Sequence, residues 1–184
     1  MRKNIIFFVD AQKKASGGGK KIYDYSNYIN SLKEFSSEII HIKKKKITKW
    51  KQSFSKFLKI KNKNYSGWKF NEIQVLKNYS FTWFNQKINI KNNLEFNNEK
   101  DLIVLPEIFA HFGVELAKQK IEYVIFLQNP YAIFSTNDFK TLEAAYEGSK
   151  LVLYYSREMK KGILKAFPKI KNKLFKTQTS FDSK

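Results

Sequence analysis

The chain of 184 residues contains no cysteine and only two histidines, His41 and His111. The lack of cysteine excludes disulfide bonds and thiolate chemistry, and two histidines argue against a histidine-rich metal site. No apolar run approaches the ~18 residues of a membrane-spanning helix. The first apolar run, at residues 5–9, is too short for the core of a signal peptide, so a cytoplasmic location is expected.

Arginine is also scarce, because Arg2 and Arg157 are the only two. Lys and Arg together nevertheless number 35 against 16 Asp and Glu, which gives a net charge of +19. Such a charge favours anionic partners, namely nucleic acid, anionic lipid or phosphorylated substrates. Specific readers of phosphates and bases usually rely on arginine, so a lysine-rich coding bias explains the charge equally well.

Short apolar runs alternate with stretches of helical periodicity. Runs rich in β-branched and aromatic residues predict strands at 4–9, 38–42, 102–105, 123–127 and 151–155, with a last one within 172–177. Helical spacing or capping residues predict helices at 22–35, 108–117, 138–147 and 156–167. Apolar runs without alternation are typical of parallel strands that are buried on both faces. The sequence therefore predicts an α/β fold, a Rossmann-like and mostly parallel sheet with helices on both faces.

Residues 1–184 are interpreted as one domain with an insertion at about residues 43–98. The first part of this insertion is lysine-rich, has no acidic residue and places apolar residues on one helical stripe. This pattern is typical of a helix that lies on an anionic membrane, although the stripe would also suit packing on the body of the protein. Nucleic-acid binding by the stretch is the least favoured reading. The residues expected to contact a membrane are Lys46, Lys49, Trp50, Phe54 and Phe57.

The rest of the insertion is rich in aromatic residues. Residues 81–84 are predicted to form a short strand. Trp68, Trp83 and Phe84 are expected to cap the core, and the alternative is that they line a pocket for a sugar acceptor.

Three consecutive glycines, Gly17, Gly18 and Gly19, follow the first predicted strand in a stretch that is expected to be a loop. They lack the third glycine of G-x-G-x-x-G, and Lys21 stands where a P-loop needs a hydroxyl residue. Glycines still allow close approach of the backbone to a phosphate or sugar, beside the free N–H groups of the next helix. The stretch is either a ligand-binding loop or a flexible connection, and its position favours binding.

Polar residues stand where the predicted strands end. Asp10 follows the first strand, Glu107 follows the strand at 102–105, and Gln128 and Asn129 follow the strand at 123–127. Because ligands of open α/β sheets bind beyond the carboxyl ends of the strands, these residues are site candidates. Glu107 and Asp10 are the candidate acid–base carboxylates, although a carboxylate at a helix N-terminus is also stabilised by the helix dipole alone.

The order of these elements resembles the N-terminal, acceptor-side domain of a GT-B glycosyltransferase of the bacterial class that builds lipopolysaccharide or capsule glycans. The likeness covers most of the chain except residues 43–98. It is carried by Ser16-Gly17-Gly18-Gly19-Lys20, Val104-Leu105-Pro106-Glu107-Ile108, Val124-Ile125-Phe126-Leu127-Gln128-Asn129, and Tyr155-Ser156-Arg157 with Ala166-Phe167-Pro168 after it.

This resemblance implies transfer of a sugar from a nucleotide-sugar donor to a glycan or lipid-linked acceptor, with no further cofactor. The donor would be held mainly by a C-terminal domain that these 184 residues do not contain, so the chain is expected to need that domain or a partner chain. Its place would be the cytoplasm or the inner face of the membrane. The alternative function is a non-catalytic, basic nucleic-acid-binding domain. The residues expected to bind donor or acceptor are Gly17, Gly18, Gly19, Lys20, Gln128, Asn129, Tyr131, Ser156 and Arg157.

Overall fold

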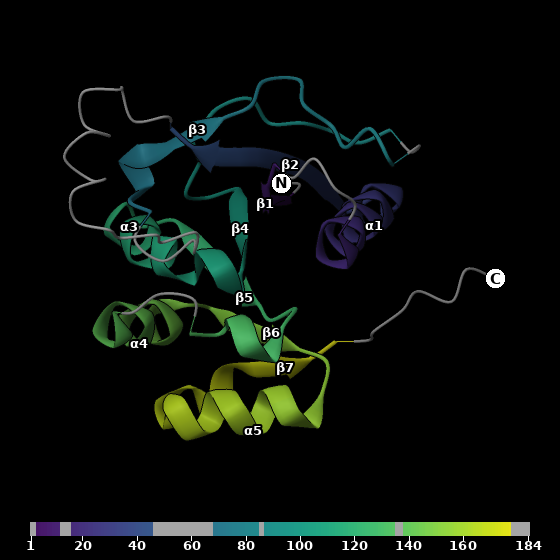
Figure 1. Ribbon diagram of the computed structural model, residues 1–184. Coiled ribbons are helices and arrows are strands. Elements are labelled where there is room, and N and C mark those ends of the chain that lie inside the picture. Colours follow the sequence, from purple (N-terminus) through teal and green to yellow (C-terminus); the bar gives the residue numbers. More distant parts are fainter. Residues whose placement is uncertain (1–2, 12–15, 46–67, 85–86, 135–137, 178–184) are drawn as a thin grey trace, which may run out of the picture.

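The computed structural model describes residues 3–11, 16–45, 68–84, 87–134 and 138–177, and within them seven strands form one sheet (Figure 1). The strand order is β3-β2-β1-β4-β5-β6-β7, and every neighbouring pair is parallel except β2 and β3. The strands are β1 (Lys3–Asp10), β2 (Phe35–Lys44), β3 (Ile73–Val75), β4 (Asp101–Pro106), β5 (Glu122–Phe126), β6 (Leu151–Tyr154) and β7 (Leu174–Lys176).

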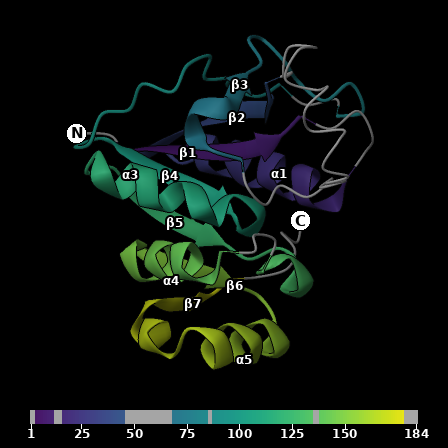
Figure 2. The same cartoon turned by 60° about the vertical axis from the view of Figure 1, so that its left-hand side comes forward.

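Helices cover both faces of this sheet (Figures 1 and 2). Helix α1 (Gly17–Ser31) packs on one face through Ile22 and Tyr23, while α3 (Gly113–Lys118), α4 (Phe139–Gly148) and α5 (Arg157–Ala166) share a second apolar cluster on the other. Four short 3-10 helices complete the described elements: η1 (Phe70–Glu72), η2 (Glu107–Phe112), η3 (Pro130–Ala132) and η4 (Pro168–Lys173). The predicted α/β, Rossmann-like fold is confirmed.

The six strands that were predicted within the sheet are confirmed, but several local predictions are wrong, two of which concern the first helix and residues 81–84. The first helix ends at Ser31 rather than at Phe35, because Phe35 pairs with Lys3 as the first residue of β2. Residues 81–84 form a turn, with the Phe84 N–H donating to the Phe81 carbonyl oxygen, and not a strand. Their aromatic rings pack in the cluster beneath α1.

The three aromatic residues that were expected to cap the core do so. Trp68 packs against the cluster on the side of α3 and α4, whereas Trp83 and Phe84 pack against the cluster on the side of α1. The five residues expected to contact a membrane lie outside the described residues. None of the described helices is long and apolar enough to cross a membrane.

Candidate functional site

A cavity of about 420 Å³ opens where β1, β4 and β5 end, and we name it the first pocket. Helix α1 leaves β1 toward one face of the sheet, and the chain after β4 turns to the other face, so a crevice forms between them. This is the switch point at which open α/β sheets bind ligands. The lining residues are Val9, Asp10, Ser16, Gly18, Gly19, Ile22, Pro106, Glu107, Ile108, Gln128, Asn129, Pro130 and Tyr155.

The first pocket brings together six of the predicted site residues, namely Asp10, Gly18, Gly19, Glu107, Gln128 and Asn129. Five others are not part of its lining. Lys20 forms an ion pair of 2.7 Å with Asp24 on the outer side of α1, and Tyr131 is 91% exposed. Gly17 and Arg157 are exposed, and Ser156 caps α5.

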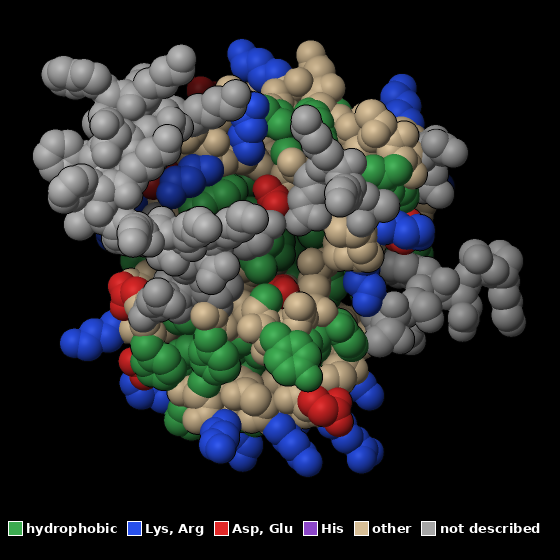
Figure 3. All heavy atoms as spheres, viewed as in Figure 1, with side chains coloured by type: hydrophobic (Ala, Val, Ile, Leu, Met, Phe, Trp, Pro, Cys, Tyr) green, Lys and Arg blue, Asp and Glu red, His purple; other side chains and the backbone are tan. Residues whose placement is uncertain are grey.

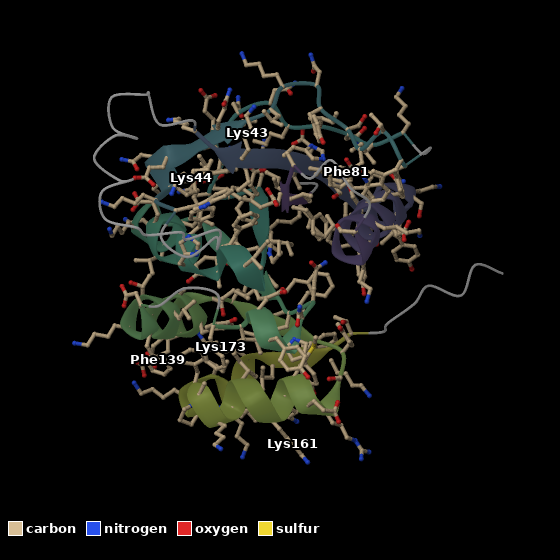
Figure 4. The ribbon with its side chains drawn as sticks, in the orientation of Figure 1. Lys43, Lys44, Phe81, Phe139, Lys161 and Lys173 are labelled. Carbon is tan, nitrogen blue, oxygen red and sulfur yellow. The ribbon has the colours of Figure 1, made fainter. Side chains whose placement is uncertain are left out.

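The triple glycine is the first turn of α1 and not a loop, which corrects the sequence interpretation. The Ser16 hydroxyl caps this turn by accepting a hydrogen bond of 3.1 Å from the Gly19 N–H. A Cβ on Gly19 would lie 2.8 Å from the Phe81 ring, which Figure 4 shows beside α1. A Cβ on Gly18 would lie 2.8 Å from Oε1 of Gln128. The two glycines therefore allow close packing around the pocket.

Glu107 lies in the first turn of η2 and is only 3% exposed. Its two carboxylate oxygens accept hydrogen bonds from the backbone N–H groups of Gln128, at 2.8 Å, and Asn129, at 3.0 Å. Burial raises the pKa of Glu107 to about 7, against the opposite effect of these N–H donors. The carboxylate therefore fixes the turn after β5, and its raised pKa also suits acid–base catalysis near neutral pH.

Gln128 connects the walls of the first pocket. Its side-chain Nε2 donates to the Gly18 carbonyl oxygen at 3.1 Å, and its own carbonyl oxygen accepts from the Tyr155 hydroxyl at 2.6 Å. The ammonium group of Lys21 lies 4.5 Å from the centre of the Tyr155 ring, and burial lowers the pKa of Lys21. Sequence reasoning missed Tyr155, although its place directly after β6 follows the same rule that found Gln128 after β5.

The pocket offers two kinds of polar group to a ligand. The first turn of α1 presents backbone N–H groups and the positive end of a helix dipole, with Lys21 nearby, and these favour an anion. Asp10 and Asn129 present acceptors and donors that suit hydroxyl groups. In the part of the chain that the structure describes, no group of three or more His, Cys, Asp or Glu residues could hold a metal ion.

Substitution of Ser156, a predicted site residue, tests whether it stabilises the fold rather than binding a ligand. Its hydroxyl accepts a hydrogen bond of 3.2 Å from the Met159 N–H at the start of α5. Ser156→Ala should lower the free energy of unfolding by ~1 kcal/mol, measured by urea titration, because the helix loses its cap. The Ser156→Ala protein should bind ligands in the first pocket like the wild type. Weaker binding without a loss of stability would show that Ser156 contributes to the binding site.

The comparisons with known proteins identify no relative of this chain. No protein-family model matches it, and no curated protein or solved structure matches it significantly. Its function therefore has to be inferred from the first pocket and from the sequence pattern.

Proposed function

We propose that this chain is the acceptor-side half of a glycosyltransferase and that the first pocket receives the sugar–phosphate end of a nucleotide-sugar donor. The observation that carries the proposal is the meeting of α1's first turn with Glu107, Asp10 and Asn129 in one cavity. A sugar phosphate combines an anion with a ring of hydroxyl groups, and the pocket combines groups for both.

The glycines support this assignment. Gly17 is exposed, and among the described residues a Cβ there would meet no atom of another segment within 4 Å, so none of the described side chains covers this end of α1. A phosphate at that place would interact with the free N–H groups of a helix of 15 residues. Glu107 is then either the acid–base group of the transfer or the residue that positions the turn at Gln128 and Asn129.

In this proposal the nucleotide is held mainly by a second Rossmann-like half, as the resemblance implies. The described chain alone should therefore bind nucleotide sugars weakly, and transfer of the sugar should require the second half. Location at a membrane surface, through the lysine-rich stretch at residues 46–57, belongs to the same proposal and would bring the enzyme to a lipid-linked acceptor.

A rival function follows from the net charge of +19, namely non-catalytic binding of nucleic acid. Proteins of that kind usually gather their basic residues in a stripe or patch. Among the described residues, Figure 3 shows Lys and Arg side chains around the edge of one face, with several along α5. We favour the pocket because it brings predicted site residues together in one cavity.

Nuclear magnetic resonance of the ¹⁵N-labelled chain tests the proposal. Titration with UDP-, GDP- and ADP-linked sugars should shift the backbone amides of Gly18, Gly19 and Gln128 in a saturable way. The amides of Gly113 and Gly148 serve as internal references, because both pack against Tyr123 away from the first pocket. Gly18→Ala should weaken this binding at least roughly tenfold by displacing the Gln128 side chain.

Gly162→Ala is the control variant, since Gly162 lies on α5 and a Cβ there meets no atom within 4 Å. It should bind nucleotide sugars like the wild type. Saturable shifts at Gly18 that survive 0.3 M salt would support the proposal. No shift with any nucleotide sugar, or shifts with single-stranded RNA that disappear as salt rises, would refute it.

A further inference from the structure

A second cavity, of about 530 Å³, lies on the side of the sheet that α3 and α4 cover. It is bounded by η1, by the junction of η2 with α3 and by the first turn of α4. We name it the second pocket. Its volume falls in the range of small-molecule sites, and nothing in the assignment of the first pocket uses it.

Aromatic residues form one wall of the second pocket, and their contacts fix them. Trp68 packs on Phe109 with ring centroids 5.9 Å apart, and Phe70 meets Phe112 edge-on at 5.6 Å. Nε2 of His111 donates a hydrogen bond of 2.9 Å to the Trp68 carbonyl oxygen, which ties the backbone before η1 to η2. A wall that is ordered before a ligand arrives lowers the entropic penalty of binding.

Carboxylates lie opposite this aromatic wall. Glu115 is 3.4 Å from Lys118 in an exposed ion pair, and its side chain is 43% exposed. Asp138 is exposed, and its two oxygens accept from the N–H and the hydroxyl of Thr141 at the start of α4. Both carboxylates reach the surface, and a carboxylate has about four acceptor positions, so each can share in a further hydrogen bond.

The charge of the second pocket differs from that of the whole chain. Its described lining contains Glu115, Asp138 and Lys69, and Lys118 beside Glu115 brings the local charge close to zero in a protein with a net charge of +19. Charges that offset one another give phosphate and carboxylate ligands no net attraction, while the carboxylate oxygens accept hydrogen bonds from hydroxyl or ammonium groups. An aromatic wall next to hydroxyl acceptors suits a ligand with one apolar face and a polar rim.

We propose that the second pocket binds a sugar ring that is uncharged or carries an amino group. The apolar face of the ring lies against Trp68, and its hydroxyl groups donate to Glu115 and Asp138. That this sugar is part of the acceptor rests on the proposed function, whereas the binding of the sugar itself does not.

Fluorine nuclear magnetic resonance of the chain labelled with 5-fluorotryptophan tests this inference. Trp68→Phe and Trp83→Phe assign the resonances, and the probes are N-acetylglucosamine, glucosamine and glucuronate. N-acetylglucosamine or glucosamine should shift the Trp68 resonance in a saturable way and leave the Trp83 resonance in place, because Trp83 packs in the cluster beneath α1. Glucuronate should give no saturable shift.

Isosteric variants assign the polar contacts. Glu115→Gln and Asp138→Asn should each weaken sugar binding roughly tenfold, because each removes a charged acceptor. Glu143→Gln is the matched control, since Glu143 lies on α4 but faces Lys169 rather than the pocket. It should bind like the wild type.

Three results would overturn the inference: no saturable shift at Trp68 with any sugar, an equal shift with glucuronate, or unchanged affinity in both isosteric variants. The first pocket is read separately through the Gly18 amide with nucleotide sugars. Sugar binding at Trp68 without nucleotide-sugar binding at Gly18 would refute the proposed function and leave the second pocket standing, and the opposite result would refute the second pocket alone.

Discussion

Gly113→Ala is expected to lower the free energy of unfolding by about 3 kcal/mol, because it overpacks the core. Its Cβ would lie 2.4 Å from Cε2 of Tyr123 and 2.9 Å from the Tyr123 hydroxyl oxygen. The ring cannot retreat, since it is 1% exposed and its hydroxyl donates to the Ala145 carbonyl oxygen at 2.6 Å. Gly113 has φ of −56°, which alanine adopts easily, so the expected loss is steric.

Gly162→Ala is expected to have the opposite effect and to stabilise the protein. Gly162 is exposed in the middle of α5, and a Cβ there meets no atom within 4 Å. Alanine should raise the free energy of unfolding by ~1 kcal/mol through its better helix propensity. Urea titrations of both variants measure the two effects. A Gly113→Ala protein as stable as the wild type would contradict the close packing of α3 on β5.

The strands were predictable because their signal is local. The runs that became β1, β4 and β5 are continuous, apolar and short, and only a sheet covered on both faces buries such runs. The start of α1 was not predictable in the same way. Three glycines disfavour a helix, and the helix forms there because Ser16 caps it and Phe81 packs against Gly19. The second of these contacts joins segments more than sixty residues apart.

Part of the candidate site was predictable, because the carboxyl ends of the parallel strands lie along the same edge of the sheet. This rule placed Asp10, Glu107, Gln128 and Asn129 in the first pocket, since the carboxyl ends of parallel strands lie together. The rule could not distinguish between the adjacent residues Tyr155 and Ser156. Tyr155 donates a hydrogen bond to the Gln128 carbonyl oxygen in the pocket, whereas Ser156 caps α5.

The only sequence signal for the second pocket was the alternative that Trp68 lines a pocket. Trp68, His111 and Asp138 come from three separate segments, and the packing of η2 against both η1 and α4 brings them together. The expectation that Trp68 caps the core was correct as far as it went, because the residue is partly buried and also lines the pocket.

Glu107→Gln is expected to change how the stability of the protein depends on pH. Burial raises the pKa of Glu107 from 4.5 to about 7, so between these values the folded state binds more protons than the unfolded state. The stability that Glu107 contributes is therefore fully present below pH 4.5 and is lost as the pH rises through about 7. Glutamine has the same shape and does not titrate. The free energy of unfolding of the wild type should therefore fall by about 3 kcal/mol relative to the variant over this range.

Urea titrations of both proteins at several pH values between 4.5 and 8 measure this difference, in which the other titrating groups cancel. Glu143→Gln is the matched control, because Glu143 is partly exposed beside Lys169, and its difference from the wild type should be small across the range. If the difference in free energy of unfolding between the wild type and Glu107→Gln does not change with pH, the N–H groups of Gln128 and Asn129 keep the carboxylate ionised at every pH tested. Glu107 would then only position the turn after β5, with no proton to transfer. If the difference in free energy of unfolding instead changes with pH as expected, Glu107 has a pKa near 7, which suits an acid–base group at neutral pH.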